Sequence, residues 1–582
     1  MLKQPDFLPT NKSEAKKLAW YPLDIIIITG DAYVDHPGFG SAIIGRHLVD
    51  KGFKVGIIDQ PDWKRSKDFE KLGKPNLFFG ISSGNMDSMV NHYTARKKIR
   101  SDDAFSPDGL AGLRPNRALL VYSQKIKSIF KNIPIIIGGI EASLRRIPHY
   151  DYWSNKLRNS ILFDSRADLL VYGMAEKTIE LVAQKLLKDE KLFNSSIPGT
   201  VTKAKKIADY NSMELLDFNS IESKEDYYHF FKKFIKNYVD KTLYMKFSAQ
   251  YLKHNPPGKS LTEKEIDAVY DNSFSRLPHP KYSGRTIPAF EQIKNSITAH
   301  RGCFGGCNFC AIGLHQGKEI RSRSVKSIMK EVEDLSGKEF FKGTISDIGG
   351  PSANMYGMYC QKDFAVKCKR RSCLYPKICS NLRTSHQKYL KLLKDVLGRK
   401  EVKNLFIASG IRFDLALKSD LFIKELAEKY VGGLLKIAPE HKNSEVLEKM
   451  YKPDFSKYEK FCKKFHRFSN AANKKQYIIP YLIVGHPGSS LKKTIYLAKY
   501  LKDNKLKIKQ VQEFTPTPMS ISTCMYYTGL DFESGKKINI PKGRIVRLQK
   551  ALVQWYKKTN KRLIFEALKR ANELGKWNYF RN

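Results

Sequence analysis

Long hydrophobic runs are absent from this 582-residue chain, and cysteine is scarce. The longest apolar stretches, such as residues 25–28 and 477–484, are far shorter than the ~18 residues that a membrane-spanning helix needs. Residues 1–20 are polar and rich in lysine, so we expect no secretory signal peptide. Nine cysteines, an odd number, do not make a disulfide-stabilised scaffold. These absences predict a cytoplasmic protein with reduced thiols and no membrane partner.

Acidic residues are outnumbered, because 103 Lys and Arg face 58 Asp and Glu and leave a net charge of +45. A content of 42% hydrophobic and 12% aromatic residues excludes a largely disordered chain. The charge has two explanations: a polyanionic partner such as RNA, or a bias toward lysine on solvated faces. Since the basic residues are spread from end to end, both explanations stay open, with RNA as a candidate partner.

Short apolar runs alternate with amphipathic stretches over the first third of the chain. Strands are expected at residues 24–29, 54–58, 76–80, 133–137 and 168–172, and helices at 41–51, 86–93, 117–130 and 176–187. This alternation predicts a doubly wound parallel α/β domain over residues 1–190. Glycines and the acidic residues Asp31 and Glu141 follow the strands, where such folds bind ligands, although glycines there also simply make turns.

Residues 191–290 are less regular, and we expect a connecting helical region there. From residue 291 the alternation resumes, with strands expected at residues 296–299, 344–348, 404–408, 434–437, 477–484 and 509–514. Six β/α units predict an incomplete (β/α)6 barrel over residues 291–530, followed by a C-terminal helical segment over residues 531–582. Functional side chains of parallel barrels lie on the loops after the strands.

Three cysteines directly follow the first expected barrel strand: Cys303, Cys307 and Cys310, spaced Cys-x3-Cys-x2-Cys. Three thiolates can hold a [4Fe–4S] cluster by three corners and leave one iron open to a reacting ligand. The intervening glycines let the backbone wrap closely and aim N–H groups at an anionic cluster. Zinc is the alternative, but a structural zinc site needs four ligands and none stands at standard spacing, although His300 and His315 are near.

Four more cysteines follow the second expected barrel strand: Cys360, Cys368, Cys373 and Cys379. They share one long loop, and long loops inside compact domains are often functional. Four thiols can close either a zinc site or an auxiliary iron–sulfur cluster, and ordinary unligated thiols are the remaining alternative. We expect the four sulfurs to converge on one metal centre above the barrel mouth.

The three-cysteine motif is typical of radical S-adenosylmethionine (SAM) proteins. Seven further segments, residues 29–37, 84–89, 138–146, 149–153, 346–351, 438–441 and 514–518, resemble the YgiQ family of radical SAM proteins. The resemblance implies that SAM binds the open iron through its amino and carboxylate groups. It also implies that one electron, from a donor such as flavodoxin or ferredoxin, cleaves SAM to methionine and a 5′-deoxyadenosyl radical. That radical abstracts hydrogen from a substrate that the family leaves open.

Comparison with related radical SAM barrels implies SAM contacts on loops after later strands. Gly349 and Gly350 match the glycine pair that meets the SAM amine, although the usual following glutamate is a proline here. Ser409 and Arg412 follow the third strand, where they can bind the SAM carboxylate and ribose. Gly485 follows the fifth strand and resembles a position beside the adenine.

Glu440 and His441 follow the fourth barrel strand and are the best candidates for acid–base catalysis or substrate contact. The N-terminal domain resembles cobalamin-binding domains that precede some radical SAM barrels. Its His36 lacks the rest of the ligand signature, because Val34 and Phe39 stand where aspartate and glycine are needed. We therefore expect no histidine-ligated cobalamin, which leaves unligated cobalamin over the strand ends, a substrate domain or a bare scaffold, with the last two favoured.

Three functions remain in competition. The first is a SAM-cleaving radical enzyme of this family acting on an unidentified substrate. The second is an RNA-modifying radical SAM enzyme, which the net charge favours but no appended RNA-binding module supports. The third is a non-enzymatic iron–sulfur or zinc protein that binds nucleic acid, which the glycine-rich three-cysteine loop disfavours.

Overall fold

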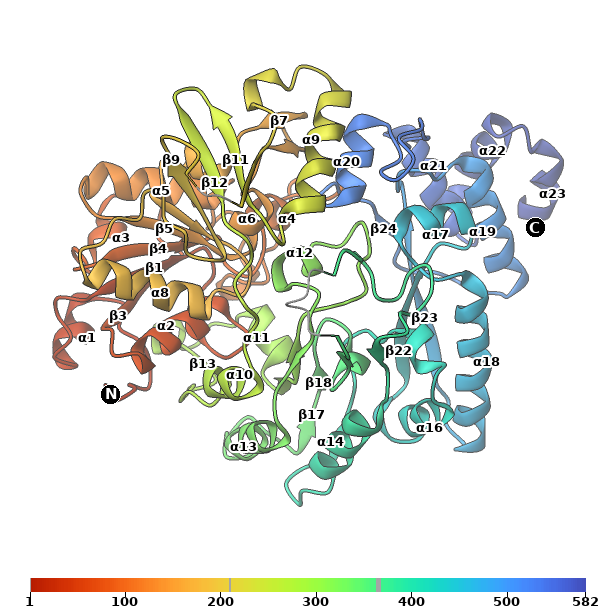
Figure 1. The fold of residues 1–582 in the computed structure, drawn as a ribbon. Helices are drawn as coiled ribbons and strands as arrows, with labels where there is room; N and C mark the ends of the chain where they lie inside the picture. The colour runs from red at the N-terminus through yellow and green to blue at the C-terminus, as the bar shows by residue number, and fades with distance from the viewer. Residues whose placement is uncertain (1, 209–210, 363–367, 582) are drawn as a thin grey trace.

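The computed structural model of the protein describes residues 2–208, 211–362 and 368–581. Figure 1 shows three parts: an N-terminal α/β domain, a second set of parallel strands with its helices, and a group of C-terminal helices. The mixed α/β architecture predicted from the sequence is confirmed. In the described part of the chain, no helix is both long and apolar enough to cross a membrane.

The N-terminal domain is built on a nine-stranded sheet. Its five parallel strands are β1 (Ile25–Thr29), β3 (Val55–Asp59), β4 (Phe78–Ser82), β5 (Ile135–Gly138) and β8 (Leu169–Val171), in the order β8-β5-β4-β1-β3. All residues of β1 and β3 are buried, since helices cover both faces of such a sheet and the strands read as continuous apolar runs. The predicted helices form as α2 (Gly40–Asp50), α4 (Ser88–His92), α5 (Ala118–Ile129) and α8 (Glu176–Leu187).

The sheet continues into the region expected to be a helical connection. β9 (Thr200–Ala204), β12 (Gln250–His254), β11 (Thr242–Phe247) and β10 (Ser212–Glu214) extend it beyond β8. That part of the prediction is wrong, although α9 (Lys224–Asn237) and α10 (Glu263–Tyr270) do form. β12 reads as polar, yet Lys253 and His254 are buried because each is paired: Lys253 donates to Ser196, and His254 stacks on Tyr172.

The second set of strands is parallel throughout. β14 (Ser296–Thr298) pairs with β18 (Asp347–Gly349), and β17 (Thr344–Ile345) pairs with β21 (Asn404–Leu405). β22 (Leu434–Glu440), β23 (Tyr477–Val484) and β24 (Gln512–Glu513) form a three-stranded sheet. Amphipathic helices α13 (Val325–Ser336), α14 (Gln387–Leu397) and α18 (Phe455–Ala471) place their apolar faces in one core with these strands.

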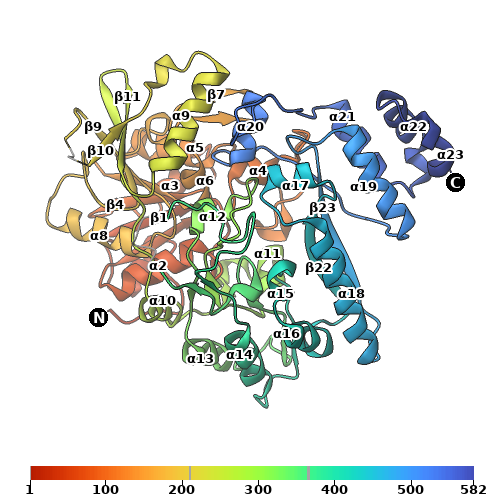
Figure 2. The same cartoon turned by 45° about the vertical axis from the view of Figure 1, so that its right-hand side comes forward.

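The C-terminal helices bridge the two α/β parts. α20 (Ile521–Thr528) lies beside α9 of the N-terminal domain, and α21 (Arg544–Val553) and α22 (Lys561–Arg570) pack on α19 (Leu491–Asp503), as Figures 1 and 2 show. The core of the second group contains Ile495, Leu552 and Leu568, all buried. α23 (Trp577–Arg581) closes this group.

A buried carboxylate fastens the start of the barrel to the preceding segment. Glu331 of α13 pairs with Arg276 and Arg323, and all three side chains are at least nine-tenths buried. The two guanidinium groups also donate to backbone carbonyls, Arg276 to Ser296 at 3.0 Å and Arg323 to Thr298 at 3.0 Å. Glu331 therefore neutralises two buried cations that hold β14 in place.

Removing this carboxylate should destabilise the protein strongly. E331A leaves two buried guanidinium groups unpaired, and we expect it to lower the free energy of unfolding by about 3–5 kcal/mol. E333A is the matched control, because Glu333 is exposed on the same helix. Urea denaturation followed by circular dichroism would compare them, and an equal midpoint for both variants would contradict the prediction.

Candidate functional site

The first cysteine loop owes its shape to two glycines. It lies between β15 (His300–Arg301) and α12 (Ile312–Gln316), with Gly302 at φ +85° and Gly306 at φ +63°. A side chain at position 302 would overlap the Glu319 carbonyl, and one at 306 would press on the backbone of residues 371 and 372. Only glycine fits such close backbone approaches at positive φ.

This loop brings the three predicted cluster cysteines together. Burial raises the pKa of the Cys303 thiol, and raises that of Cys310 to about 12, and in both cases the nearby Cys307 thiol adds to the rise. Backbone N–H groups lower these pKa values. The N–H of Gly305 acts on Cys303, and the N–H groups of Ile312 and Gly313 act on Cys310. The loop thus gathers three thiols and aims amide donors at their sulfurs.

Two buried cations stand beside these thiols. Nη1 of Arg412 lies 3.6 Å from Sγ of Cys307, and its other nitrogens are held by Asp414 at 2.9 and 2.8 Å. The ammonium of Lys452 lies 3.5 Å from Oε1 of Glu440. Both cations are close enough to Cys303 to lower the pKa of its thiol. Arg412 was predicted from the sequence, whereas Lys452 was missed because no motif marks it in the loop after α17 (Ser444–Met450).

The predicted SAM-contact residues after β18 and β21 also come together. A side chain on Gly349 would overlap the hydroxyl of Ser409, which donates to the carboxylate of Asp347. Gly350 lies against the ring of His300, where a Cβ would stand 2.6 Å from Cε1. The His300 ring is buried. Asp347 belongs to a motif that the sequence singled out, but it was not among the predicted site residues.

The remaining predicted residues, Glu440, His441 and Gly485, do not lie together: only Glu440 faces the cations beside the thiols. Glu440 faces Arg412 and Lys452, and burial raises its pKa. It adopts φ +66° at an irregularity in β22, a strained conformation that is typical of functional sites. His441 turns instead toward His486, and its Nδ1 accepts from the backbone N–H of Asn443. Gly485 donates its N–H to Gln549 of α21, so it faces the C-terminal helices.

The second cysteine group lies directly against the first. β19 (Tyr359–Cys360) pairs with β20 (Leu382–Arg383) and closes the loop between them, part of which is outside the described residues. The backbone N–H of Cys373 donates to Phe304 at 3.0 Å, and that of Cys379 donates to Cys373 at 2.8 Å. Burial raises the pKa of Cys373 to about 11, and the thiols of Cys368, Cys379 and Cys360 are near enough to raise it too.

The donors around the first loop suit an anionic iron–sulfur cluster. They combine three thiols, backbone amides and the cations Arg412 and Lys452. Within residues 2–208, 211–362 and 368–581, no three His, Cys, Asp or Glu side chains are close enough for a single metal ion. The thiolates of a cubane cluster bind different irons and are spaced more widely. His315, a nearby candidate in the zinc alternative, bonds to Ser143 of the N-terminal domain at 2.9 Å.

The expected ligand crevice of the N-terminal sheet is filled by the chain itself. In the order β8-β5-β4-β1-β3, the direction of winding reverses between β1 and β4. There the carboxylate of Asp31 accepts from the backbone N–H of Asn85 at 2.7 Å and pairs with Arg114 at 2.9 Å. Arg114 also pairs with Asp103 at 3.1 Å. Burial raises the pKa of Asp31 to about 6.

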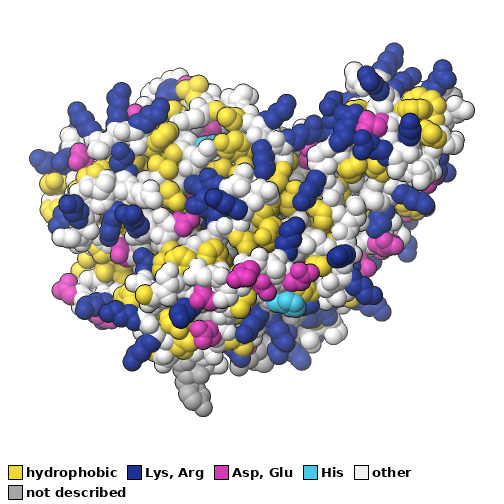
Figure 3. Space-filling model, turned by 90° about the horizontal axis from the view of Figure 1, so that it is seen from above, with side chains coloured by type: hydrophobic (Ala, Val, Ile, Leu, Met, Phe, Trp, Pro, Cys, Tyr) yellow, Lys and Arg dark blue, Asp and Glu magenta, His cyan; other side chains and the backbone are white. Residues whose placement is uncertain are grey.

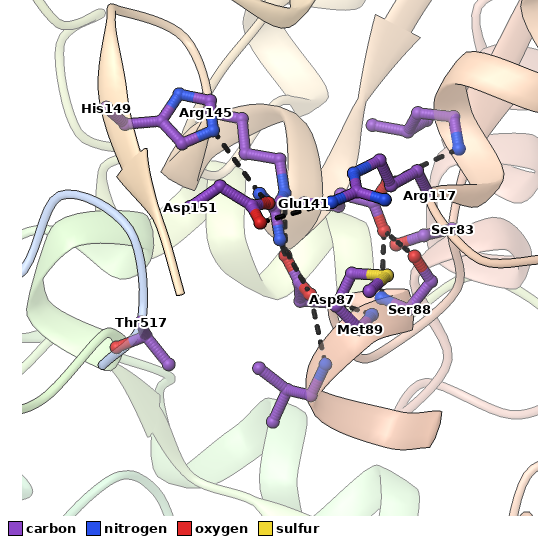
Figure 4. Close-up of polar contacts among 12 residues, drawn as sticks. Ser83, Asp87, Ser88, Met89, Arg117, Glu141, Arg145, His149, Asp151 and Thr517 are labelled. Carbon is purple, nitrogen blue, oxygen red and sulfur yellow. Dashed lines mark hydrogen bonds and ion pairs between the residues drawn. The ribbon is translucent and has the colours of Figure 1, made fainter. Parts of the chain in front are cut away.

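A second buried network follows β5 and is drawn in Figure 4. Glu141 accepts from the backbone N–H of Ser88 at 2.8 Å, and Arg145 pairs with Asp87 at 2.9 Å and Asp151 at 3.2 Å. His149 completes the network: its Nε2 lies 3.3 Å from Arg145, and its Nδ1 lies 3.0 Å from the carbonyl of residue 147. Every carboxylate here has partners within the domain, so the network fixes the loops after the strands.

Comparison with known proteins divides the chain into three matched regions. Residues 7–296 match "Radical SAM N-terminal", residues 297–501 match "Radical SAM superfamily", and residues 509–575 match "Domain of unknown function (DUF3362)". A UPF0313 protein of Methanocella arvoryzae is 47% identical over 569 residues, covering 96% of this chain and 95% of that protein. A UPF0313 protein of Geobacter sulfurreducens is 45% identical over 581 residues, covering 97% and 94%.

Two solved structures are distant likenesses. TsrM from Kitasatospora setae, a radical S-adenosylmethionine methyltransferase with cobalamin and a [4Fe–4S] cluster bound, has a TM-score of 0.48 at 12% identity. The match covers 86% of this chain and 77% of the TsrM chain. OxsB, a cobalamin-dependent S-adenosylmethionine radical enzyme, has a TM-score of 0.47 at 12% identity and covers 90% and 59%.

The network around His149 should make the protein sensitive to acid. Burial and the nearby Arg145 lower the pKa of His149 to about 3, against about 6.5 in an unfolded chain. Between these values only the unfolded chain binds the proton, so stability falls as the pH drops below 6.5. From pH 7 to pH 5 this one group should cost about 2 kcal/mol.

We therefore expect H149Q to lose less stability than the wild type over that interval. H229Q is the control, since His229 is exposed on α9, and it should keep the wild-type dependence. Urea unfolding at pH 7, 6 and 5 measures the difference. Parallel pH profiles for H149Q and the wild type would show that His149 does not carry this sensitivity.

Proposed function

Because this chain belongs to the UPF0313 family of radical SAM proteins, we propose that Cys303, Cys307 and Cys310 hold the [4Fe–4S] cluster of a SAM-cleaving enzyme. The domain match makes the chain a radical SAM enzyme; the family name identifies no substrate. When bound, the cluster and SAM supply a one-electron cleavage that yields methionine and a 5′-deoxyadenosyl radical, which takes hydrogen from the substrate. The observation that carries the assignment is the gathering of three thiols beside two buried cations.

Each neighbouring group has a defined task in this proposal. Arg412 binds the SAM carboxylate, because its guanidinium is fixed by Asp414 and one nitrogen is directed at the thiols. Gly349, Gly350 and Ser409 would line the cofactor, since Gly349 packs against Ser409 and Gly350 packs against His300, just before the cysteine loop. The apolar side chains of Phe304, Met355 and Leu415 pack beside Cys303 and exclude water.

Glu440 is the proposed acid–base or substrate-contact group. Burial raises the pKa of Glu440, whereas the nearby cations Lys452 and Arg412 offset part of that rise. His441 is turned away toward His486, and we assign it a packing role behind Glu440. Gly485 is engaged with Gln549, which favours a structural role over adenine contact.

We also propose that Cys360, Cys368, Cys373 and Cys379 form a second metal centre. Two observations support this second centre. The four thiols are near one another, and the backbone N–H of Cys373 donates a hydrogen bond to the carbonyl of Phe304, next to the first group. An auxiliary cluster fits these thiols better than a single zinc ion, because no three His, Cys, Asp or Glu side chains of the described residues are close enough for one metal ion. The proposed SAM cleavage requires an electron donor such as flavodoxin or ferredoxin, whichever metal the second group holds.

Cobalamin is not part of the proposal, although TsrM and OxsB bind it. His36 is buried and its Nδ1 accepts from the backbone N–H of Gly38 at 2.9 Å. The strand ends beside it are bridged by Asp31 and Arg114. Both observations favour a scaffold role for the N-terminal sheet.

The cluster assignment is tested by removing its ligands. We expect C303A/C307A/C310A, reconstituted anaerobically, to contain about four fewer irons and sulfides per chain than the wild type, because one [4Fe–4S] cluster is lost. It should form no 5′-deoxyadenosine with dithionite and SAM. C462A is the control, since Cys462 lies on α18 beside Tyr458 and away from both cysteine groups. Unchanged iron in the triple variant would refute the assignment.

The role of Arg412 is tested with its partner removed as well. Changing Arg412 alone would leave Asp414 buried and unpaired, so the informative variant is R412Q/D414N. Loss of one charge-assisted contact is worth about 1.5–3 kcal/mol, so SAM should bind roughly tenfold or more weakly in equilibrium dialysis. D414N keeps the guanidinium but loses the charge that fixes it, so it should lose less SAM affinity than R412Q/D414N. Equal SAM affinity for R412Q/D414N and the wild type would remove Arg412 from the site.

A further inference from the structure

A cavity of about 430 Å³ opens where the three parts of the chain meet. Its walls come from the loop after α4, from the ends of β23 and β24, and from the start of α21. In Figure 3, Lys and Arg side chains flank the hollow where the lobe of C-terminal helices joins the rest of the molecule. Among the described residues that line the groove, Gly485 is the one site residue predicted from the sequence, and none of the cysteines is among them.

The groove carries a surplus of positive charge. Arg96, Lys97, Lys542, Arg544 and Arg547 line it, with Glu513 as the single carboxylate of its lining. That carboxylate is already neutralised, because Arg96 donates to both of its oxygens at 2.7 Å and Lys550 donates at 2.8 Å.

Two of the five cations are available to a ligand. The side chain of Arg547 is exposed and makes no hydrogen bond or ion pair with another of the described residues. Lys542 lies 5.0 Å from the ring centre of Tyr526, and burial together with the nearby Lys224 lowers its pKa. Positive groups crowded in this way favour an anion between them.

Three half-buried aromatic rings stand among these cations: Tyr152, Phe514 and Tyr526. The centre of the Tyr526 ring is 5.9 Å from that of Tyr152 and 6.0 Å from that of Phe514. Lys97 covers Tyr152 at 4.6 Å. Aromatic rings interleaved with cations bind bases by stacking and backbone phosphates by charge.

The groove is connected to the cysteine loop by a row of rings. Phe514 lies 5.2 Å from His486, and His486 lies 6.2 Å from Phe309, the residue before Cys310. The ends of β23 and β24 thus place the groove at the rim of the proposed active site, since these parallel strands end on that face.

We propose that this groove binds single-stranded nucleic acid, with a base against Tyr526 and Tyr152 and phosphates at Lys542 and Arg547. The exposed rim of cations suits a chain of phosphates that continues beyond the cavity. The further claim that the bound nucleic acid is the substrate rests on the proposed function. Only that function places a reactive centre beside Phe309, at the far end of the row of rings.

Fluorescence anisotropy with labelled 12-nucleotide RNA and DNA tests the proposal on the full-length reconstituted protein at 50–200 mM salt. K542E/R547E should bind at least tenfold more weakly. Its salt dependence should be shallower by about 1.4 in log–log slope, from ~0.7 for each lost phosphate contact. Y526L removes the stacking platform and should weaken binding fivefold or more with an unchanged salt slope.

The control is K557E/K558E, which changes the net charge equally on exposed lysines outside the groove. It should stay within twofold of the wild type. An equal loss in K557E/K558E would assign binding to overall charge and overturn the proposal, as would a mononucleotide that competes as well as the 12-mer.

The assay uses neither SAM nor reductant, so a failure to bind leaves the cluster assignment intact. A protein that binds the strand in the predicted pattern but forms no 5′-deoxyadenosine would contradict the proposed function alone. Circular dichroism of each variant distinguishes a lost contact from a lost fold.

Discussion

The burial of thiols beside fixed cations is the constraint on which the centre of this molecule depends. Buried thiols are protonated at neutral pH, as the raised pKa values of Cys303 and Cys310 indicate. A metal centre reverses that preference, because its ligands must be thiolates. Arg412 and Lys452 then stand where negative charge would accumulate, and Asp414 keeps the guanidinium in place before any ligand arrives. The protein side of the site is therefore organised in advance of its cofactors.

The N-terminal domain is bound to this centre by buried polar contacts. Arg301, which precedes the cysteine loop, pairs with Glu176 of α8, and both side chains are buried. On the other side of the loop, His315 of α12 meets Ser143. The filled strand ends of the N-terminal sheet fit this arrangement, since a domain used as a support needs rigid loops. Its networks around Asp31 and Arg145 provide that rigidity through paired charges.

The two cysteine groups share one structural unit. Gly306 lets the second loop approach the first, and Ser372 donates to the carbonyl of Gly305 at 2.7 Å. These contacts join the backbones of the two loops directly. Cys368 is exposed at the outer edge while Cys373 is buried, so the second group spans the distance from solvent to the first loop.

The family, the positions of most parallel strands along the chain and the three-cysteine loop could be predicted from the sequence, because they depend on local spacing and on short apolar runs such as residues 25–29. β9, β11 and β12 could not, since Lys253 and His254 read as surface residues until Ser196 and Tyr172 are seen to pair with them. Spacing likewise assigned Glu440 and His441 one role, and the left-handed backbone of Glu440 turned them in different directions. Lys452 and the basic groove around Tyr526 depend on contacts between residues far apart in the chain, which only tertiary packing creates. The local spacing of residues in the sequence determines which residues can bind a metal. Packing between residues far apart in the chain determines which charges surround that metal.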